Sequence, residues 1–234
     1  MDIVLIGGLW LNATAWDATT PALEAAGHRV AALTLPGQGD GNAAATLDNQ
    51  LDAVVSAVDA AAGPVLAIGH SAACTLAWLA ADRRPEKVAR VAMIGGMPSA
   101  EGEAYFDGLP IEDDLVRFPG WERFEGPDAA DLTPDMRDAI TGRVEGVPAA
   151  VAQGIVTYTN ADRGRTPVTL ICPEFSPAEA REWLAGGHMP ELETVEQLDY
   201  VDIESGHWPM FSKPDELARI INQLAERSLA RTRG

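Results

Sequence analysis

The stretch around Ser71 constrains this chain more than any other. An apolar run at 65–68, typical of a buried strand, leads into the pentapeptide Gly-His-Ser-Ala-Ala at 69–73, and an apolar segment of helical character follows. A strand that turns this sharply into a helix holds its central serine in a strained backbone conformation, so the residues two before and two after it must be small. Gly69 and Ala73 meet this requirement. The stretch therefore predicts a turn that presents Ser71 as a nucleophile, and the alternative is an ordinary turn whose serine caps the helix.

Apolar runs bounded by turn residues alternate with segments of helical period along most of the chain, which indicates parallel strands joined by crossover helices. Leu47 to Val58 and Leu217 to Leu224 carry the apolar stripes of core-facing helices. The length of 234 residues suits one domain with a sizeable core. We therefore predict an α/β fold in which a mostly parallel central sheet of about six strands is flanked by helices. The predicted strands lie at residues 3–6, 30–35, 65–68, 88–94, 168–172 and 198–203.

From residue 99 to residue 165 the alternation stops. No strong strand pattern occurs there, and glycine, proline and acidic residues are dense around Trp121 and Phe124. Ligands of open α/β sheets bind outside the carboxyl ends of the strands, so a segment that leaves the strand at 88–94 can cover the serine. We predict that residues 1–98 and 166–234 form the core and that residues 99–165 form a cap inserted into it. The alternative is a surface excursion with no role at the site.

The charge of the chain limits its partners. Lys and Arg number 17 and Asp and Glu 35, and the formal net charge of −18 disfavours nucleic acids and anionic membrane surfaces. The sequence starts with no basic leader and has no stretch long enough to span a bilayer, so we expect a cytoplasmic protein. Cys74 and Cys172 lie in apolar surroundings that favour buried thiols, and the histidines lack metal-binding spacing. We expect no metal and no cofactor; the oligomeric state stays open.

A serine hydroxyl becomes a strong nucleophile only when a neighbouring base takes its proton. His207 is the candidate base, because it follows the last predicted strand and precedes the last helix, where the chain order serine, acid, histidine places it. His188 is the weaker alternative. His28 precedes a strand at the opposite end of the sheet, and His70 is fixed beside the serine by the turn and is expected to point elsewhere.

Two backbone N–H groups are needed to stabilise the oxyanion that develops on an attacked carbonyl. Ala72, directly after the serine, supplies the first, and Leu9, in the loop after the first strand, is our prediction for the second. The glycines of that loop, Gly7 and Gly8, are also consistent with an ordinary flexible strand exit.

Six stretches of the sequence resemble one known superfamily. They are residues 4–10 (VLIGGLW), 23–30 (LEAAGHRV), 35–39 (LPGQG), 69–73 (GHSAA), 96–98 (GMP) and 206–207 (GH). The chain resembles the α/β-hydrolase superfamily and, within it, the small plant-type branch of methylesterases and hydroxynitrile lyases. The resemblance extends nearly end to end. It implies a serine hydrolase with a helical cap after the strand that ends near Met97.

The chain departs from that branch in the loop after its first strand and beside its late histidine. The branch usually has His-Gly where this chain has Gly7 and Gly8. Cyanohydrin cleavage in the branch goes with a lysine directly after the catalytic histidine and a threonine in the oxyanion loop, whereas this chain has Trp208 and Gly8. A lyase function therefore lacks the cation that would take up departing cyanide.

The acid that orients the histidine is the second departure. The aspartate of the branch follows the strand at 168–172 and aligns with Phe175 or Ser176, neither of which is acidic. Glu174 is adjacent and one methylene longer than aspartate, so we predict that it reaches the histidine from a shifted register. Its rivals Asp202 and Glu204 lie so close to the histidine in sequence that they do not reach round to its far nitrogen. The alternative for Glu174 is an exposed loop carboxylate.

The sequence thus predicts a carboxylesterase that forms an acyl-enzyme on the serine and acts on a small, largely apolar ester. The side chains expected to line the pocket are Trp10, Met97, Trp208 and, from the cap, Trp121. A lyase or acyltransferase with the same site is one alternative, distinguished by whether water is the final acceptor. A ligand-binding or sensor protein with a degraded triad is another, suggested by the missing aspartate.

Overall fold

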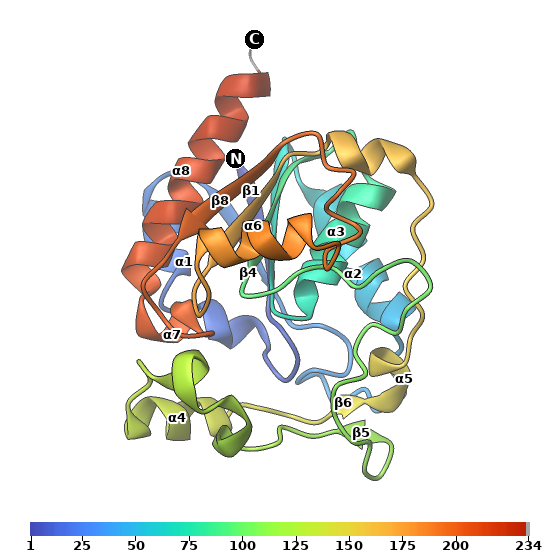
Figure 1. Cartoon of the computed structure of the whole chain (residues 1–234), viewed down its shortest axis with the longest axis vertical. Helices are drawn as coiled ribbons and strands as arrows, with labels where there is room; N and C mark the ends of the chain where they lie inside the picture. Colours follow the sequence, from blue (N-terminus) through green and yellow to red (C-terminus); the bar gives the residue numbers. More distant parts are fainter. Residues whose placement is uncertain (233–234) are drawn as a thin grey trace.

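The computed structural model describes residues 1–232 and is built around a six-stranded sheet (Figure 1). The strands lie in the order β2-β1-β3-β4-β7-β8, and every neighbouring pair is parallel. Each of the six predicted strands is present, and the predicted α/β fold is confirmed. The strands are β1 (Asp2–Ile6), β2 (Arg29–Leu33), β3 (Val65–His70), β4 (Val88–Ile94), β7 (Val168–Cys172) and β8 (Leu198–Asp202).

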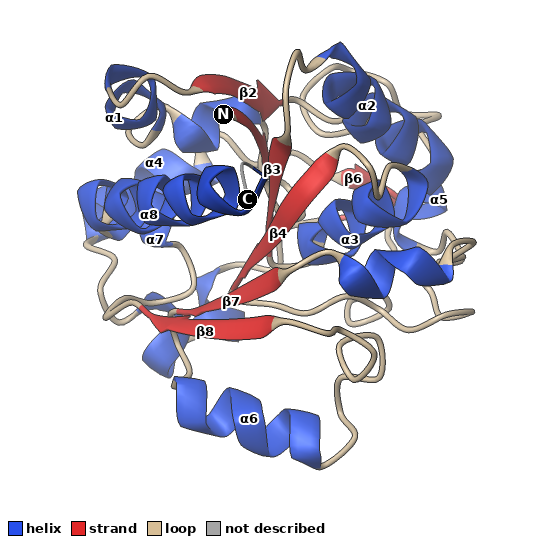
Figure 2. Cartoon of the chain, turned by 90° about the horizontal axis from the view of Figure 1, so that it is seen from above, coloured by secondary structure: helices blue, strands red, loops and turns tan. Residues whose placement is uncertain are grey.

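Helices cover both faces of the sheet (Figure 2). The first and last helices pack together on one face, the two helices that flank β3 in sequence pack together on the other, and α6 lies beside β7 and β8. Both predicted helical stripes face the core, one on α2 and one on α8. The helices of the core are α1 (Thr20–Ala25), α2 (Leu47–Ala60), α3 (Ala73–Arg83), α6 (Pro177–Ala185), α7 (Pro209–Ser212) and α8 (Pro214–Thr232), with a 3-10 helix, η1 (Ala13–Trp16), after β1.

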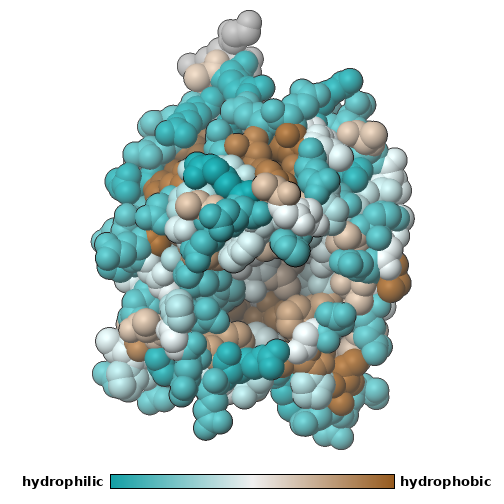
Figure 3. All heavy atoms as spheres, in the orientation of Figure 1, coloured by the Kyte–Doolittle hydropathy of each residue, from teal (hydrophilic) through white to brown (hydrophobic). Residues whose placement is uncertain are grey.

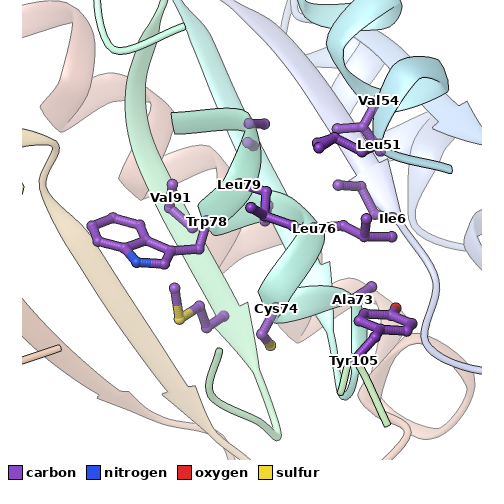
Figure 4. Close-up of a cluster of buried hydrophobic side chains, with 14 of the residues drawn as sticks. Ile6, Leu51, Val54, Ala73, Cys74, Leu76, Trp78, Leu79, Val91 and Tyr105 are labelled. Carbon is purple, nitrogen blue, oxygen red and sulfur yellow. The ribbon is translucent and has the colours of Figure 1, made fainter. Parts of the chain in front are cut away.

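The side chains of strand β1 pack against the helices on both faces of the sheet. Successive side chains of a strand point to opposite faces, and here Ile3 and Leu5 join the buried cluster under α1 and α8, while Val4 and Ile6 join the cluster under α2 and α3. Figure 4 shows part of the second cluster, in which Trp78 of α3 is fully buried. The four aliphatic side chains of β1 therefore bury apolar surface, which stabilises the sheet by about 25 cal/mol per Å² removed from water.

The order of the strands fixes where a site can form. The chain passes from β1 outward to β2 and then returns to place β3 on the other side of β1. Winding therefore reverses between β1 and β3, and the loops that leave these two strands diverge from the carboxyl end of the sheet. These are the loop at residues 7–10 and the turn that contains Ser71.

Residues 99–165 connect β4 to β7. In Figure 1 the part at residues 115–152 lies below the carboxyl ends of the strands, whereas the chain that follows it rises along the core to residues 161–165 beside α3. The segment consists of short elements and irregular chain, and its two strands are two residues long each and pair with one another, outside the main sheet. No helix of the described residues is long and apolar enough to cross a membrane. The elements of the segment are β5 (Leu115–Val116), η2 (Trp121–Phe124), η3 (Gly126–Ala129), α4 (Pro134–Thr141), β6 (Val147–Pro148), α5 (Ala149–Ala152) and η4 (Ala161–Arg165).

Candidate active site

Ser71 occupies the sharp turn between β3 and α3. Its φ of +54° lies in the left-handed region, which costs a non-glycine residue about 1–3 kcal/mol, and its backbone N–H donates to the carbonyl of Ile94 at 2.8 Å. A Cβ on Gly69 would lie 2.3 Å from the carbonyl oxygen of Ala73, and one on Gly96 would lie 2.7 Å from that of Ser71. The turn therefore requires glycine at both positions, and the expected strand, turn and helix are all present.

His207 and Glu174 form a hydrogen-bonded pair. His207 Nδ1 lies 2.7 Å from Glu174 Oε1, with 14 % and 15 % of the two side chains exposed. Glu174 follows β7 and His207 follows β8, so the carboxyl ends of two adjacent strands bring together residues 33 positions apart. Because the carboxylate accepts from Nδ1, Nε2 is the ring nitrogen left to exchange a proton with another group. Glu174 is thus a partner of His207 and not a free loop carboxylate.

Gly95, at the end of β4, contacts this pair. Its φ is +58°, and a Cβ added to it would lie 3.0 Å from His207 Nδ1 and 3.2 Å from Glu174 Oε2. The absence of a side chain at this position therefore leaves room for the histidine and the glutamate. Gly95 could not be predicted from the sequence, because nothing near it in the chain marks a contact with residues far downstream.

The backbone of His207 is held from two sides. Its N–H donates to the carbonyl of Asp128 in η3 at 2.7 Å, and its carbonyl accepts from Nε2 of His70 at 2.8 Å. His70 is buried, and burial together with the charge of His207 holds its pKa well below the ordinary value, so its ring is neutral. His70, expected to point elsewhere, thus positions the histidine across the site; the rings lie 4.8 Å apart between centroids.

The loop after β1 lies against the serine turn. A Cβ on Gly8 would come within 2.9 Å of both Ser71 Cβ and the His70 carbonyl oxygen, so glycine permits the contact. Trp10 has a φ of +69°, and its indole N–H donates to the Val116 carbonyl at 3.0 Å. The neighbouring Leu9 is therefore held against the site. Ala72 is the N-cap of α3, so its own backbone N–H lies ahead of the hydrogen-bond ladder of the helix.

A cavity of about 170 Å³ opens beside Ser71 and His207. Trp10 and Trp208 line it, while Met97 packs against the core and Trp121 lies behind the wall, its ring 5.2 Å from that of Trp208. Figure 3 shows this side of the molecule hollowed, with apolar side chains in the hollow. Four further lining residues come from the 99–165 segment, of which the sequence analysis singled out only the last: Phe106, Leu109, Arg123 and Phe124.

Other candidates from the sequence lie elsewhere. Phe175 packs its ring on Trp183, Ser176 caps α6, and both Asp202 and Glu204 are exposed without an ion pair to His207. His188 is exposed, and His28 contacts Asn222 of α8 at 2.8 Å. Cys74 and Cys172 are free and buried, and burial raises the pKa of the Cys172 thiol to about 12. Among residues 1–232, no three His, Cys, Asp or Glu side chains are grouped to hold a metal ion.

Residues 3–220 match the alpha/beta hydrolase family. Among characterised proteins, the chain is 26 % identical to the pimeloyl-[acyl-carrier protein] methyl ester esterase of Aromatoleum aromaticum over 95 % of its own length and 97 % of that protein. It is also 32 % identical to the pyrethroid hydrolase of Sphingobium wenxiniae, over 56 % of this chain and 45 % of that one.

Solved structures share the fold over almost the whole chain. An extracellular alpha/beta-hydrolase from a Paenibacillus species superimposes with a TM-score of 0.78 at 17 % identity, covering 95 % of this chain and 98 % of that one. A methylesterase from Arabidopsis superimposes with a TM-score of 0.76 at 18 % identity, covering 97 % and 99 %. The resemblance to a superfamily with plant methylesterases among its members is therefore confirmed. With the family match covering most of its length, the chain belongs to the alpha/beta hydrolase family.

Proposed function

We propose that this protein is a serine carboxylesterase with the catalytic triad Ser71, His207 and Glu174. The observation that carries the proposal is the 2.7 Å contact between His207 Nδ1 and Glu174 Oε1, made beside the cavity that Ser71 also lines. A buried carboxylate on Nδ1 fixes the tautomer in which Nε2 accepts a proton, which is the arrangement that activates a serine. The names of the relatives, an esterase of a methyl ester and a pyrethroid hydrolase, support ester hydrolysis.

The reaction begins when His207 Nε2 takes the hydroxyl proton of Ser71 as Oγ attacks the ester carbonyl. Negative charge develops on the carbonyl oxygen, and the backbone N–H groups of Leu9 and Ala72 stabilise it. His207, now an imidazolium stabilised by Glu174, returns the proton to the departing alkoxide. The acyl group is left on Ser71, and water activated by the same histidine releases it.

Residues 99–165 act as a cap in this proposal. They supply Phe106, Leu109 and Phe124 to the cavity wall, so they shield the cavity from bulk solvent and set the size of ester that enters. The carbonyl of Asp128 also holds the backbone of His207, which ties the cap to the base. Trp10 and Trp208 complete an apolar wall, which suits a small apolar ester.

The test is covalent labelling with a fluorophosphonate, followed by peptide mass spectrometry and a panel of chromogenic esters. We expect modification at Ser71, and we expect Ser71→Ala to lose labelling and ester turnover while keeping the wild-type melting temperature within a few degrees. Folded protein with unmodified Ser71 would refute the esterase and favour the ligand-binding alternative. Acyl transfer to an added alcohol in place of hydrolysis would favour the acyltransferase.

A further inference from the structure

One charged side chain, exposed to solvent, lies beside the apolar walls of the cavity. Among the described residues that line it, Arg123 is the one with a permanently charged side chain, and the two histidines are the other ionisable residues. Arg123 belongs to η2, and its neighbour Phe124 contributes to the wall. A guanidinium is ionised at every pH at which the protein is folded, so this cavity always has a cation on its rim.

No carboxylate of residues 1–232 forms an ion pair with Arg123. Its one hydrogen bond to the described chain runs from Nη2 to the carbonyl of Gly108 at 3.2 Å, across to the segment that supplies Phe106 and Leu109. The carboxylates nearest in sequence, Glu122 and Glu125, are exposed and form no ion pair with it. Arg123 therefore keeps N–H groups that can bind an anion at the cavity.

A free cation at this position has a specific effect in an acidic protein. The net charge of −18 repels anionic substrates at long range, while a guanidinium on the rim attracts them at short range. The remaining wall offers apolar contacts from Trp10, Phe106, Phe124 and Trp208. The cavity thus has mostly apolar walls and one cationic side chain, Arg123, at its rim.

We propose, resting on the esterase function above, that Arg123 selects esters whose far end carries a carboxylate, such as half-esters of dicarboxylic acids. The ester carbonyl lies at Ser71, the methylene chain fills the cavity, and the carboxylate accepts hydrogen bonds from Arg123. A volume of about 170 Å³ holds roughly five or six water-sized groups, which favours a chain of intermediate length such as that of adipate.

The experiment compares monomethyl esters of dicarboxylic acids, from succinate to suberate, with methyl esters from butanoate to octanoate, in which a methyl group replaces the carboxylate. For wild type we expect a higher kcat/KM for the anionic member of the best pair, through a lower KM. Arg123→Gln keeps an amide N–H for the Gly108 carbonyl and removes the charge, so it should reduce the anionic-to-neutral ratio of kcat/KM about 5- to 20-fold. Arg123→Lys should retain part of the preference.

The control is Arg227→Gln, which removes the same charge from an exposed position on α8 away from the cavity and should leave the ratio at its wild-type value. A ratio that is equal in wild type and Arg123→Gln, with both esters slowed together, would show that Arg123 only ties two cap segments together and would overturn the proposal. A wild-type preference for the neutral ester would overturn it as well.

A binding measurement separates this proposal from the esterase function itself. Ser71→Ala protein is titrated with monomethyl adipate and with methyl hexanoate, and the fluorescence of the cavity tryptophans Trp10 and Trp208 reports binding. We expect tighter binding of the anionic ester, weakened about 5- to 20-fold by adding Arg123→Gln and weakened by salt. If wild type fails to hydrolyse any ester but this difference persists, the triad proposal falls and the anion site stands.

Discussion

Gly95→Ala tests the contact between the end of β4 and the His207–Glu174 pair. The added Cβ would lie 3.0 Å from His207 Nδ1 and 3.2 Å from Glu174 Oε2, which is closer than ordinary van der Waals contact. The histidine and the glutamate must therefore each give way by a few tenths of an ångström. Gly27 is the matched control, because its φ of +86° is also left-handed and a Cβ there meets nothing within 4 Å.

Both substitutions strain the backbone, but only Gly95→Ala also pushes on His207 and Glu174. Placing alanine in the left-handed region costs about 1–2 kcal/mol at either position, which lowers the melting temperature of a chain of this size by roughly 2–8 °C. Only Gly95→Ala also displaces the base relative to Ser71. Because small misplacements of a catalytic group cost up to about 10² in rate, we expect kcat to fall about 10- to 100-fold with KM nearly unchanged.

The assay is ester turnover at saturating substrate, beside thermal unfolding of both variants. Gly27→Ala should keep wild-type kcat and share the loss of melting temperature. If Gly95→Ala turns over as fast as Gly27→Ala, the His207–Glu174 pair has room to move and its placement against Gly95 has no catalytic consequence. If kcat fell equally in both variants, the fall would result from lost stability and not from the contact with His207 and Glu174.

Three further predictions follow from contacts in other parts of the structure. Glu174→Gln keeps the shape of the side chain and removes its charge, so turnover should fall by about 10² to 10⁴ with the fold intact, whereas Asp202→Asn should have no such effect; the reverse pattern would move the acid to the last strand. Shortening the 99–165 segment outside η3 should change the preferred ester chain length more than the melting temperature, and unchanged selectivity in a folded variant would contradict the cap. Hydrogen bonds from Arg29 hold the pKa of Asp2 below its usual 3.8, so the charged carboxylate stabilises the fold above that pH and the stabilisation is lost as the pH falls through the lowered pKa. Thermal unfolding of Asp2→Asn should therefore show a deficit at neutral pH that shrinks below pH 3.8, and a deficit independent of pH would refute this linkage.

The fold was readable from the sequence because its signals are local. A strand buried on both faces is mostly apolar, and the predicted bounds of β4 and β7 agree with the structure residue for residue. The turn at Ser71 was readable for a similar reason, since Gly69 and Ala73 meet a steric requirement within five residues of chain. Glu174 could be selected because it is the only carboxylate between the end of β7 and Glu179.

The residues of the cavity wall could be predicted only in part from the sequence. Trp10, Met97, Trp121 and Trp208 are all large and apolar, and burying such a side chain is favourable whether it faces a cavity or the core behind it. Composition therefore cannot decide between these environments, and only the path of the 99–165 segment makes Phe124 a wall and Trp121 its backing. That segment has little periodicity from which its path could be inferred.

The contacts that hold the base in place depend mostly on backbone and hence on little that a sequence displays. His207 donates its N–H to the carbonyl of Asp128 and accepts from His70 through its own carbonyl, and Gly95 contributes only the space left by a missing side chain. A carbonyl is present at every residue, so neither Asp128 nor its neighbours could be distinguished from the sequence. Because the serine turn and the 99–165 segment each bind one backbone group of the same histidine, we expect a substitution that displaces η3 and breaks the Asp128 contact to loosen His207 as well as the cavity wall.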